Sequence, residues 1–124
     1  MKPNELMIGD WVEYGQYITT VRNLSDKIVL SGCVGRLDEV RPVPLTEKIL
    51  ENNGATRYGA KYANLQQWVL KFGDKRKTIM QDVLHEEWCA NDVWFKYVHE
   101  LQHILRLIGI NDLADNFKVK GGAK

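Results

Sequence analysis

The sequence predicts an α+β fold from three observations. β-Branched and aromatic residues crowd the first third of the chain, an N-cap signal opens a short helix mid-chain, and an amphipathic segment lies near the C-terminus. The chain has 124 residues, which fits one domain that can bury a core without disulfides or metal. We expect one domain over residues 1–118, with an SH3-like small β-barrel or meander (6–45), a connecting helix (46–54), an antiparallel β-sheet packed by an amphipathic C-terminal helix (55–118), and a flexible tail (119–124).

The N-terminal unit is predicted from short segments of β formers separated by turn residues. The phrases LMIGDWVEY, QYITTVRNL, KIVLSG and CVGRLDEV carry strand signals, with turns expected at Gly9-Asp10 and Ser25-Asp26. Pro42 and Pro44 then stop regular pairing. Parallel pairing is not expected because it needs a crossover connection, and no helix separates these strands.

The middle of the chain begins with a helix and continues as strands. Thr46 is the predicted N-cap, and Asn52-Asn53-Gly54 is typical of a helix C-terminus. TRYGAKYA, QQWVLKFG, KRKTIMQDV and VWFKYV predict strands, with turns at Gly59 and Gly73-Asp74, whereas LHEEWCAND is ambiguous. Aromatic side chains dominate core burial, so three tryptophans at strand-like positions are expected in the core: Trp68, Trp88 and Trp94.

The last helix is predicted from Tyr97 to Gly109. At about 100° per residue, one stripe of this helix is apolar and is expected to pack on the sheet: Leu101, Ile104, Leu105 and Ile108. The other side is polar and is expected to face solvent: His99, Gln102, His103 and Arg106. A short final turn, capped by Asn111 or Asp112, is expected to run through Phe117.

Composition narrows the class of protein. The net charge is +1, which gives no broad cationic field for nucleic acid. The N-terminal phrase MKPNELMIGDW lacks the apolar core of a signal peptide, and no window approaches the ~18 apolar residues of a membrane span, so a cytoplasmic protein is expected. Cys33 and Cys89 are expected to be free thiols in a reducing compartment, with a disulfide as the less favoured alternative.

The predicted last helix contains His99-Glu100-Leu101-Gln102-His103, which has the H-E-x-x-H spelling of zinc peptidases. Residues four apart stack on one helix face, so two imidazoles could hold zinc while Glu100 activates a bound water. A third ligand is missing from the expected continuation, and Arg106 stands where one peptidase class has glycine. We therefore expect no catalytic residue, no metal and no cofactor, and keep a minimal zinc hydrolase as the alternative.

Three segments together resemble a group of small uncharacterised proteins of Bacteroides-type gut bacteria and their phages or mobile elements. The matching segments are NELMIGDWVEY (4–14), VRPVPLTEKILENNG (40–54) and FKYVHELQHILRLIGI (95–110). In that group the position of Glu100 is often Gln and the position of His103 is often Asn. The resemblance therefore implies a structural helix, and it implies no activity.

Other candidate sites have structural explanations as well. Aromatic residues near the first turns could line a partner groove, although one or two could simply fill a small core: Trp11, Tyr14 and Tyr17. Basic residues around KFGDKRK could contact phosphate, or could simply keep a hairpin tip soluble: Lys71, Lys75, Arg76 and Lys77, with Arg57 and Lys61 nearby. Cys89 near His85 lacks a visible orienting acid, and Gly32-Cys33-Val34-Gly35 lacks the Lys-Ser/Thr of a phosphate loop.

The sequence thus favours a non-enzymatic accessory or adaptor protein of phage or mobile-element origin that binds a protein partner. The zinc hydrolase is the first alternative. A nucleic-acid-binding module that uses the basic turn 71–77 is the second.

Overall fold

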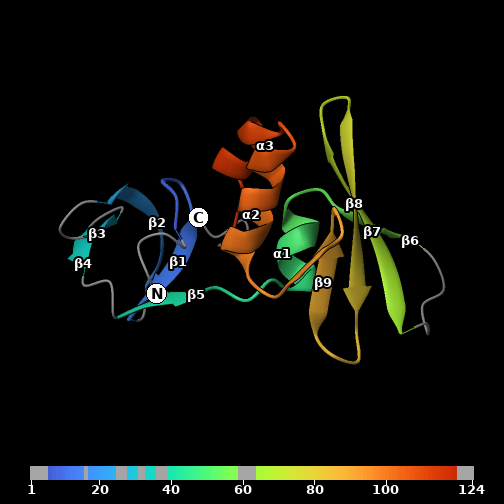
Figure 1. Cartoon of the computed structure of the whole chain (residues 1–124), viewed down its shortest axis with the longest axis horizontal. Helices are drawn as coiled ribbons and strands as arrows, with labels where there is room; N and C mark the ends of the chain where they lie inside the picture. The colour runs from blue at the N-terminus through green and yellow to red at the C-terminus, as the bar shows by residue number, and fades with distance from the viewer. Residues whose placement is uncertain are drawn as a thin grey trace.

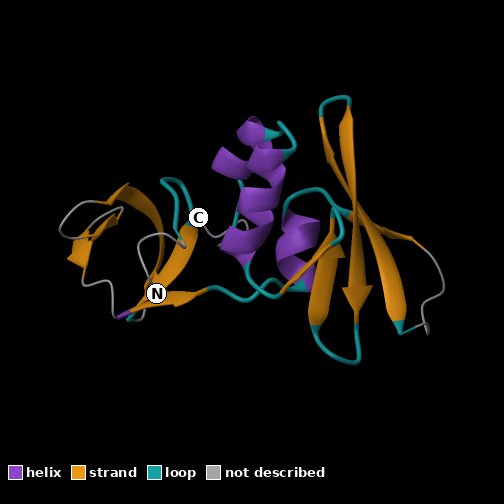
Figure 2. Ribbon diagram, viewed as in Figure 1, coloured by secondary structure: helices purple, strands orange, loops and turns teal. Residues whose placement is uncertain are grey.

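The computed structural model describes residues 6–15, 17–24, 28–30, 33–35, 39–58 and 64–119. These residues form two antiparallel β-sheets with helices between them (Figures 1 and 2). The predicted α+β class and the antiparallel pairing are confirmed. Among the described residues, no helix is long and apolar enough to cross a membrane.

The first sheet contains five strands in the order β4-β3-β2-β1-β5. They are β1 (Trp11–Tyr14), β2 (Tyr17–Leu24), β3 (Ile28–Leu30), β4 (Cys33–Gly35) and β5 (Val40–Pro42). Strands β1 to β4 form a meander, and β5 returns to pair with β1. This sheet has a small core of its own: Leu6, Val12, Val21, Leu30 and Val40. No pairing of the described strands joins β4 to β5, so closure into an SH3-like barrel stays a prediction.

The second sheet has the order β10-β9-β8-β7-β6, with every neighbouring pair antiparallel. Its strands are β6 (Thr56–Tyr58), β7 (Leu65–Phe72), β8 (Lys75–Asp82), β9 (Glu87–Ala90) and β10 (Val93–Phe95). The ambiguous segment LHEEWCAND therefore contains a strand. Asn91 and Asp92 have φ values of 54° and 64°, which a two-residue type I′ hairpin requires. The sequence signal for this hairpin is weak because Asn-Asp stands in place of the usual Asn-Gly.

In the described part of the chain, three α-helices complete the fold: α1 (Glu47–Asn52), α2 (Val98–Leu107) and α3 (Asn111–Asp115). Thr46 is the N-cap of α1 as predicted, since its Oγ1 accepts from the backbone N–H of Ile49 at 3.2 Å. The predicted cap of the final turn was wrong, because the N-cap of α3 is Ile110 and no side chain caps this helix.

The main core lies between the helices and one face of the second sheet (Figure 1). Trp68 and Trp88 are buried there and meet edge to face at 6.3 Å, and Leu101 and Leu105 of α2 are fully buried, as the apolar stripe predicts. Trp94 was expected in this core, but its side chain is 52% exposed. The reason is register, because Trp94 pairs with Cys89 on the face that the helices do not cover.

Some predictions fall partly or wholly outside the described residues. The turns at Ser25-Asp26 and Gly59 lie outside them, as do Lys61, Gly32 and residues 120–124 of the predicted tail. Val119, the first residue assigned to that tail, is buried in the main core. The main core therefore includes a residue beyond position 118.

Candidate functional site

The H-E-x-x-H segment lies on α2, between the two sheets (Figure 1). Glu100 Oε1 accepts from the backbone N–H groups of Lys96 at 3.2 Å and Tyr97 at 3.1 Å. These bonds satisfy donors at the start of the helix, and the carboxylate also complements the positive end of the helix dipole. The residue that would serve as the catalytic base is thus occupied as a helix cap.

His103 and Arg106 of α2 converge on Asp10, which lies in the loop before β1 and is 0% exposed. Asp10 Oδ2 lies 2.6 Å from His103 Nε2, and Asp10 Oδ1 accepts from Arg106 Nη1 at 2.7 Å. The backbone N–H of Met7 also donates to Oδ2, at 2.7 Å. A buried carboxylate needs such partners, since an unpaired buried charge is very costly.

The same face of α2 holds a second polar junction around Gln102, which is 0% exposed. Its Oε1 accepts from the backbone N–H of Trp11, and its Nε2 donates to the carbonyls of Gly9 and Ala114, each at 2.9 Å. The predicted solvent-facing side of α2 was therefore wrong. The loop before β1 and the start of β1 lie against this side of α2. The polar side chains of the helix form hydrogen bonds with them and do not face solvent.

Gly9 allows this close approach. Its φ is +93°, and a Cβ placed on it would lie 3.0 Å from Arg106 Nη2. An L residue with a side chain would face both a strained backbone and this contact. The predicted Gly9-Asp10 turn thus brings the loop against α2.

His99 completes the motif and is buried. Its ring stacks on Tyr97 with centroids 6.2 Å apart and meets the ring of His103 edge to face at 5.5 Å. Within the described ranges, no group of three or more His, Cys, Asp or Glu residues is placed to hold a metal ion. Each motif residue therefore has a contact that explains it without a metal.

Replacing Glu100 with alanine is expected to lower the free energy of unfolding by about 1 kcal/mol, because the N-terminal donors of α2 lose their acceptor. Glu100→Gln keeps an acceptor oxygen and should lose less than half of that. Urea denaturation of both variants beside the wild type provides the measurement. A neutral Glu100→Ala variant would contradict the capping role.

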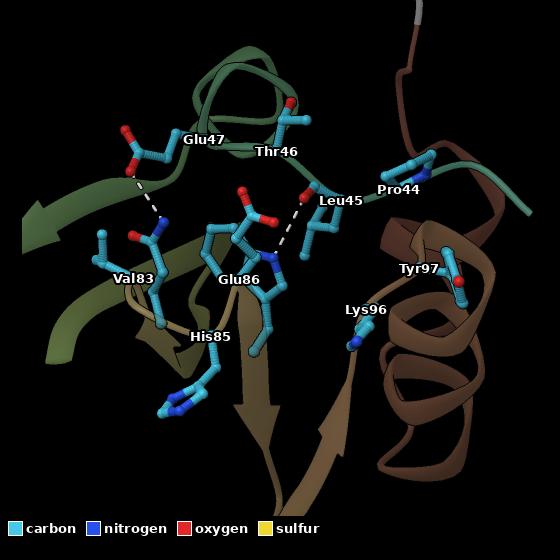
Figure 3. A pocket seen from close by; sticks show the side chains of 11 residues that line it. Pro44, Leu45, Thr46, Glu47, Val83, His85, Glu86, Lys96 and Tyr97 are labelled. Carbon is cyan, nitrogen blue, oxygen red and sulfur yellow. Dashed lines mark hydrogen bonds between the residues drawn. The ribbon is translucent and has the colours of Figure 1, made fainter. Parts of the chain in front are cut away.

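A pocket of about 480 Å³ lies where the start of α1, the β8–β9 turn and the residues before α2 meet (Figure 3). Trp88 Nε1 donates to the carbonyl of Leu45 at 3.2 Å, and Gln81 Nε2 donates to Glu47 at 2.9 Å. The other polar lining residues include Glu86 and Lys96, which carry opposite charges, and His85. Sequence reasoning missed this pocket because its walls come from three separate segments.

The walls of this pocket do not combine an activated nucleophile with a base. Among the described residues that line it there is no serine or cysteine, and Thr46 Oγ1 is used as the α1 cap. His85 pairs instead with Asp82, whose Oδ2 lies 2.8 Å from Nδ1. The side-chain hydrogen bond from His85, followed by its backbone N–H, lowers the pKa of Asp82. Cys89, considered beside His85 as a nucleophile, lies on the outward face of the second sheet.

The three aromatic residues of the first sheet are not in equivalent places. Trp11 packs against the main core and its Nε1 donates to the carbonyl of Phe117. Tyr14 packs against the small core of its own sheet, and Tyr17 is exposed. A partner groove formed by all three stays a prediction, and Tyr17 is the member that solvent reaches most.

The basic turn 71–77 distributes its charges over two faces of the β7–β8 hairpin. Lys71 and Arg76 are directly opposite one another and point outward, whereas Lys77 pairs with the buried Leu70 and is half-buried. Lys75 Nζ donates to the carbonyl of Gly109 at 3.3 Å. Arg57 lies over the ring of Trp68, 5.9 Å from its centroid. These cations do not form one continuous phosphate-contacting patch.

The face of the second sheet away from the helices is here called the outer face. Strand register places one cross-strand row on it that runs through all five strands: Trp94, Cys89, Met80, Gln67 and Tyr58. The next row contains Thr78, Val69 and Thr56. Trp94, Tyr58 and Leu65 are exposed large apolar side chains on this face. The outer face therefore exposes aromatic side chains on both edge strands, with half-buried Met80 and Cys89 between them.

Charges of one sign gather at each end of the outer face. Lys71 pairs directly with Arg76 at one end, and Asp82 pairs directly with Glu87 at the other. Like charges directly opposite one another destabilise a sheet. The alternation of KRKTIMQD and LQQWVLKF could have predicted these two ends, had the register of the strands been known.

No family model, curated protein or solved structure matches this chain. The geometry of the described residues therefore has to support any functional proposal by itself.

Proposed function

We propose that this protein is a non-enzymatic accessory or adaptor protein that binds a protein partner through its outer face. The observation that carries the proposal is the cross-strand row of the second sheet that exposes Trp94 and Tyr58 and lies between a basic and an acidic end. Protein interfaces commonly combine an aromatic centre with a charged rim. A phage or mobile-element origin, a cytoplasmic location and an SH3-like first sheet remain part of the proposal, and they are supported by the sequence alone.

A protein suits this face better than nucleic acid does. Nucleic acid is bound mainly through cations that contact phosphates, and a face that also carries Asp82 and Glu87 would repel it. The cations of the 71–77 turn are divided between two faces, and Lys75 is bonded to the chain itself. Exposed Trp94, at the β10 end of the cross-strand row, favours an apolar contact.

The zinc hydrolase is less well supported, because Glu100 caps α2 and His103 bonds to Asp10. Zinc analysis of protein purified without added metal tests it directly. Stoichiometric zinc that is lost in His103→Ala would favour the hydrolase over the adaptor.

Photo-crosslinking tests the proposed face. A benzoylphenylalanine placed at Trp94 or Thr78 on the outer face is expected to form discrete protein adducts in the cells that naturally make the protein. The matched control is Leu107 on α2, which is 80% exposed and lies off this face, and should give none. The proposal fails if the folded protein gives no adduct from Trp94 or Thr78, or the same adducts from all three positions.

A further inference from the structure

The two ends of the outer face are complementary to each other. Along β8, Arg76 and Asp82 are six positions apart, which places the basic and acidic ends about 20 Å from one another. Within one copy this distance prevents the two ends from pairing. Each end instead keeps two like charges directly opposite one another, Lys71 with Arg76 and Asp82 with Glu87, although His85 already hydrogen-bonds to the Asp82 carboxylate.

In a dimer whose two-fold axis lies parallel to the outer face and perpendicular to its strands, the like charges at both ends of the face would meet opposite charges of the other copy. Rotation about this axis reverses the strand direction and brings the outer faces of two copies together. The basic end of each copy then lies over the acidic end of the other, at two equivalent places. Such an isologous arrangement needs a self-complementary surface, and the charge order along β8 supplies it.

We propose that the partner of the outer face is a second copy of this chain, bound face to face with strands antiparallel. This inference rests on the proposed function, since it names the partner of the same face. The apolar row of Trp94, Met80 and Tyr58 then packs against the row that contains Val69 in the other copy. Two sheets packed in this way lie about 10 Å apart.

The size of the face predicts a weak and reversible dimer. β7 and β8 cover about 20 Å between the charged ends, whereas β6, β9 and β10 have only three or four residues and cover about 10–13 Å. With strands about 4.8 Å apart, the face measures roughly 350 Å² per copy and about 700 Å² in total, which is below the size of standard specific interfaces. Because charge pairs contribute at both ends, the dissociation constant should rise with salt concentration.

Charge exchange tests the dimer by sedimentation equilibrium. Lys71→Glu/Arg76→Glu makes both ends of the face acidic. Asp82→Asn/Glu87→Lys makes both ends basic, and the Asn side chain keeps an acceptor for the His85 N–H that Asp82 now binds. Each variant alone is expected to dimerise on the order of 10-fold more weakly or worse, because like charges now meet. An equimolar mixture of the two should restore a one-to-one dimer, since opposite ends meet again.

Three results would overturn the dimer. The first is a wild type that stays monomeric up to about 1 mM, which is at the weak end of measurable association. The second is self-association that neither charge variant weakens. The third is an equimolar mixture of the two variants that does not dimerise. Near-ultraviolet circular dichroism confirms that each variant is folded. Trp94→Ser should weaken the dimer, whereas Leu107→Ser, which removes an even more exposed apolar group on α2, should not.

Cys89 gives an independent readout. It lies in the apolar row and is half-buried in the single chain. In a Cys33→Ser background, its alkylation should slow as protein concentration rises. If the wild type is monomeric but Trp94 still crosslinks to a different protein, the dimer is wrong and the adaptor proposal stands; if Trp94 and Thr78 form no adduct at all, both fail.

Discussion

Replacing Asp10 with alanine is expected to lower the free energy of unfolding by about 3 kcal/mol, since breaking a buried ion pair leaves an uncompensated charge. Asp10 is fully buried, and it accepts from Arg106 Nη1 and the backbone of Met7 while it contacts His103. The variant would leave the Arg106 guanidinium against the Gly9 loop without this acceptor. Urea denaturation at neutral pH measures the loss.

The matched control uses the same arginine. Arg106 Nε also donates to Asp115 at 3.4 Å, but the Asp115 side chain is 59% exposed. Asp115→Ala should therefore change the stability by no more than about 0.5 kcal/mol, as for other surface ion pairs. In the double variant Asp10→Ala/Arg106→Leu the unpaired charge is gone, so part of the loss should be recovered. Equal effects of Asp10→Ala and Asp115→Ala would show that burial does not determine the strength of this contact.

Gln102→Leu is expected to have a similar effect, a loss of about 3 kcal/mol. Leucine keeps most of the volume, but the Trp11 N–H and the carbonyls of Gly9 and Ala114 lose their partner. Each buried polar group left unsatisfied costs about 1–3 kcal/mol. Thermal and urea denaturation measure the change.

Gln67→Leu provides the comparison, because Gln67 is an exposed glutamine on β7. The same substitution there should stay within about 0.5 kcal/mol. Denaturation at low protein concentration keeps self-association out of this comparison. A Gln102→Leu variant as stable as Gln67→Leu would mean that Gln102 does not join the first sheet to α2.

These contacts describe how the two sheets are held together. The first sheet has its own small core, and the main core belongs to the second sheet and the helices. Between them, Trp11 contributes apolar packing, while Asp10 and Gln102 contribute buried polar contacts. Such bonds have strict geometry, so they fix the orientation of the first sheet on α2.

Much of the fold could be predicted from local signals. Thr46 caps α1, the Leu101/Leu105 stripe of α2 faces the core, and the antiparallel strands follow the β-rich segments. The errors share a cause. Side-chain type predicts a core position for Trp94 and a solvent-facing polar side for α2, but strand register exposes Trp94 and the Asp10 loop covers the polar side of α2.

The candidate site was predicted less well than the fold. The H-E-x-x-H spelling suggested a metal, yet its glutamate caps a helix and its second histidine contacts Asp10. The outer face depends on which residues of five strands lie opposite one another. The sequence of one strand shows only which of its own side chains share a face. It does not show which residues of the neighbouring strands lie opposite them.

Local signals in the sequence predict most of the elements and their order, because caps, turns and periodicity act between residues a few positions apart. What covers the polar side of α2, and which face of the second sheet stays open, depend on contacts between distant parts of the chain. The polar contacts from α2 to the Asp10 loop and the start of β1 join residues 91 to 96 positions apart. Periodicity shows which side of a helix is polar, but it cannot show whether water or another part of the chain supplies the hydrogen bonds.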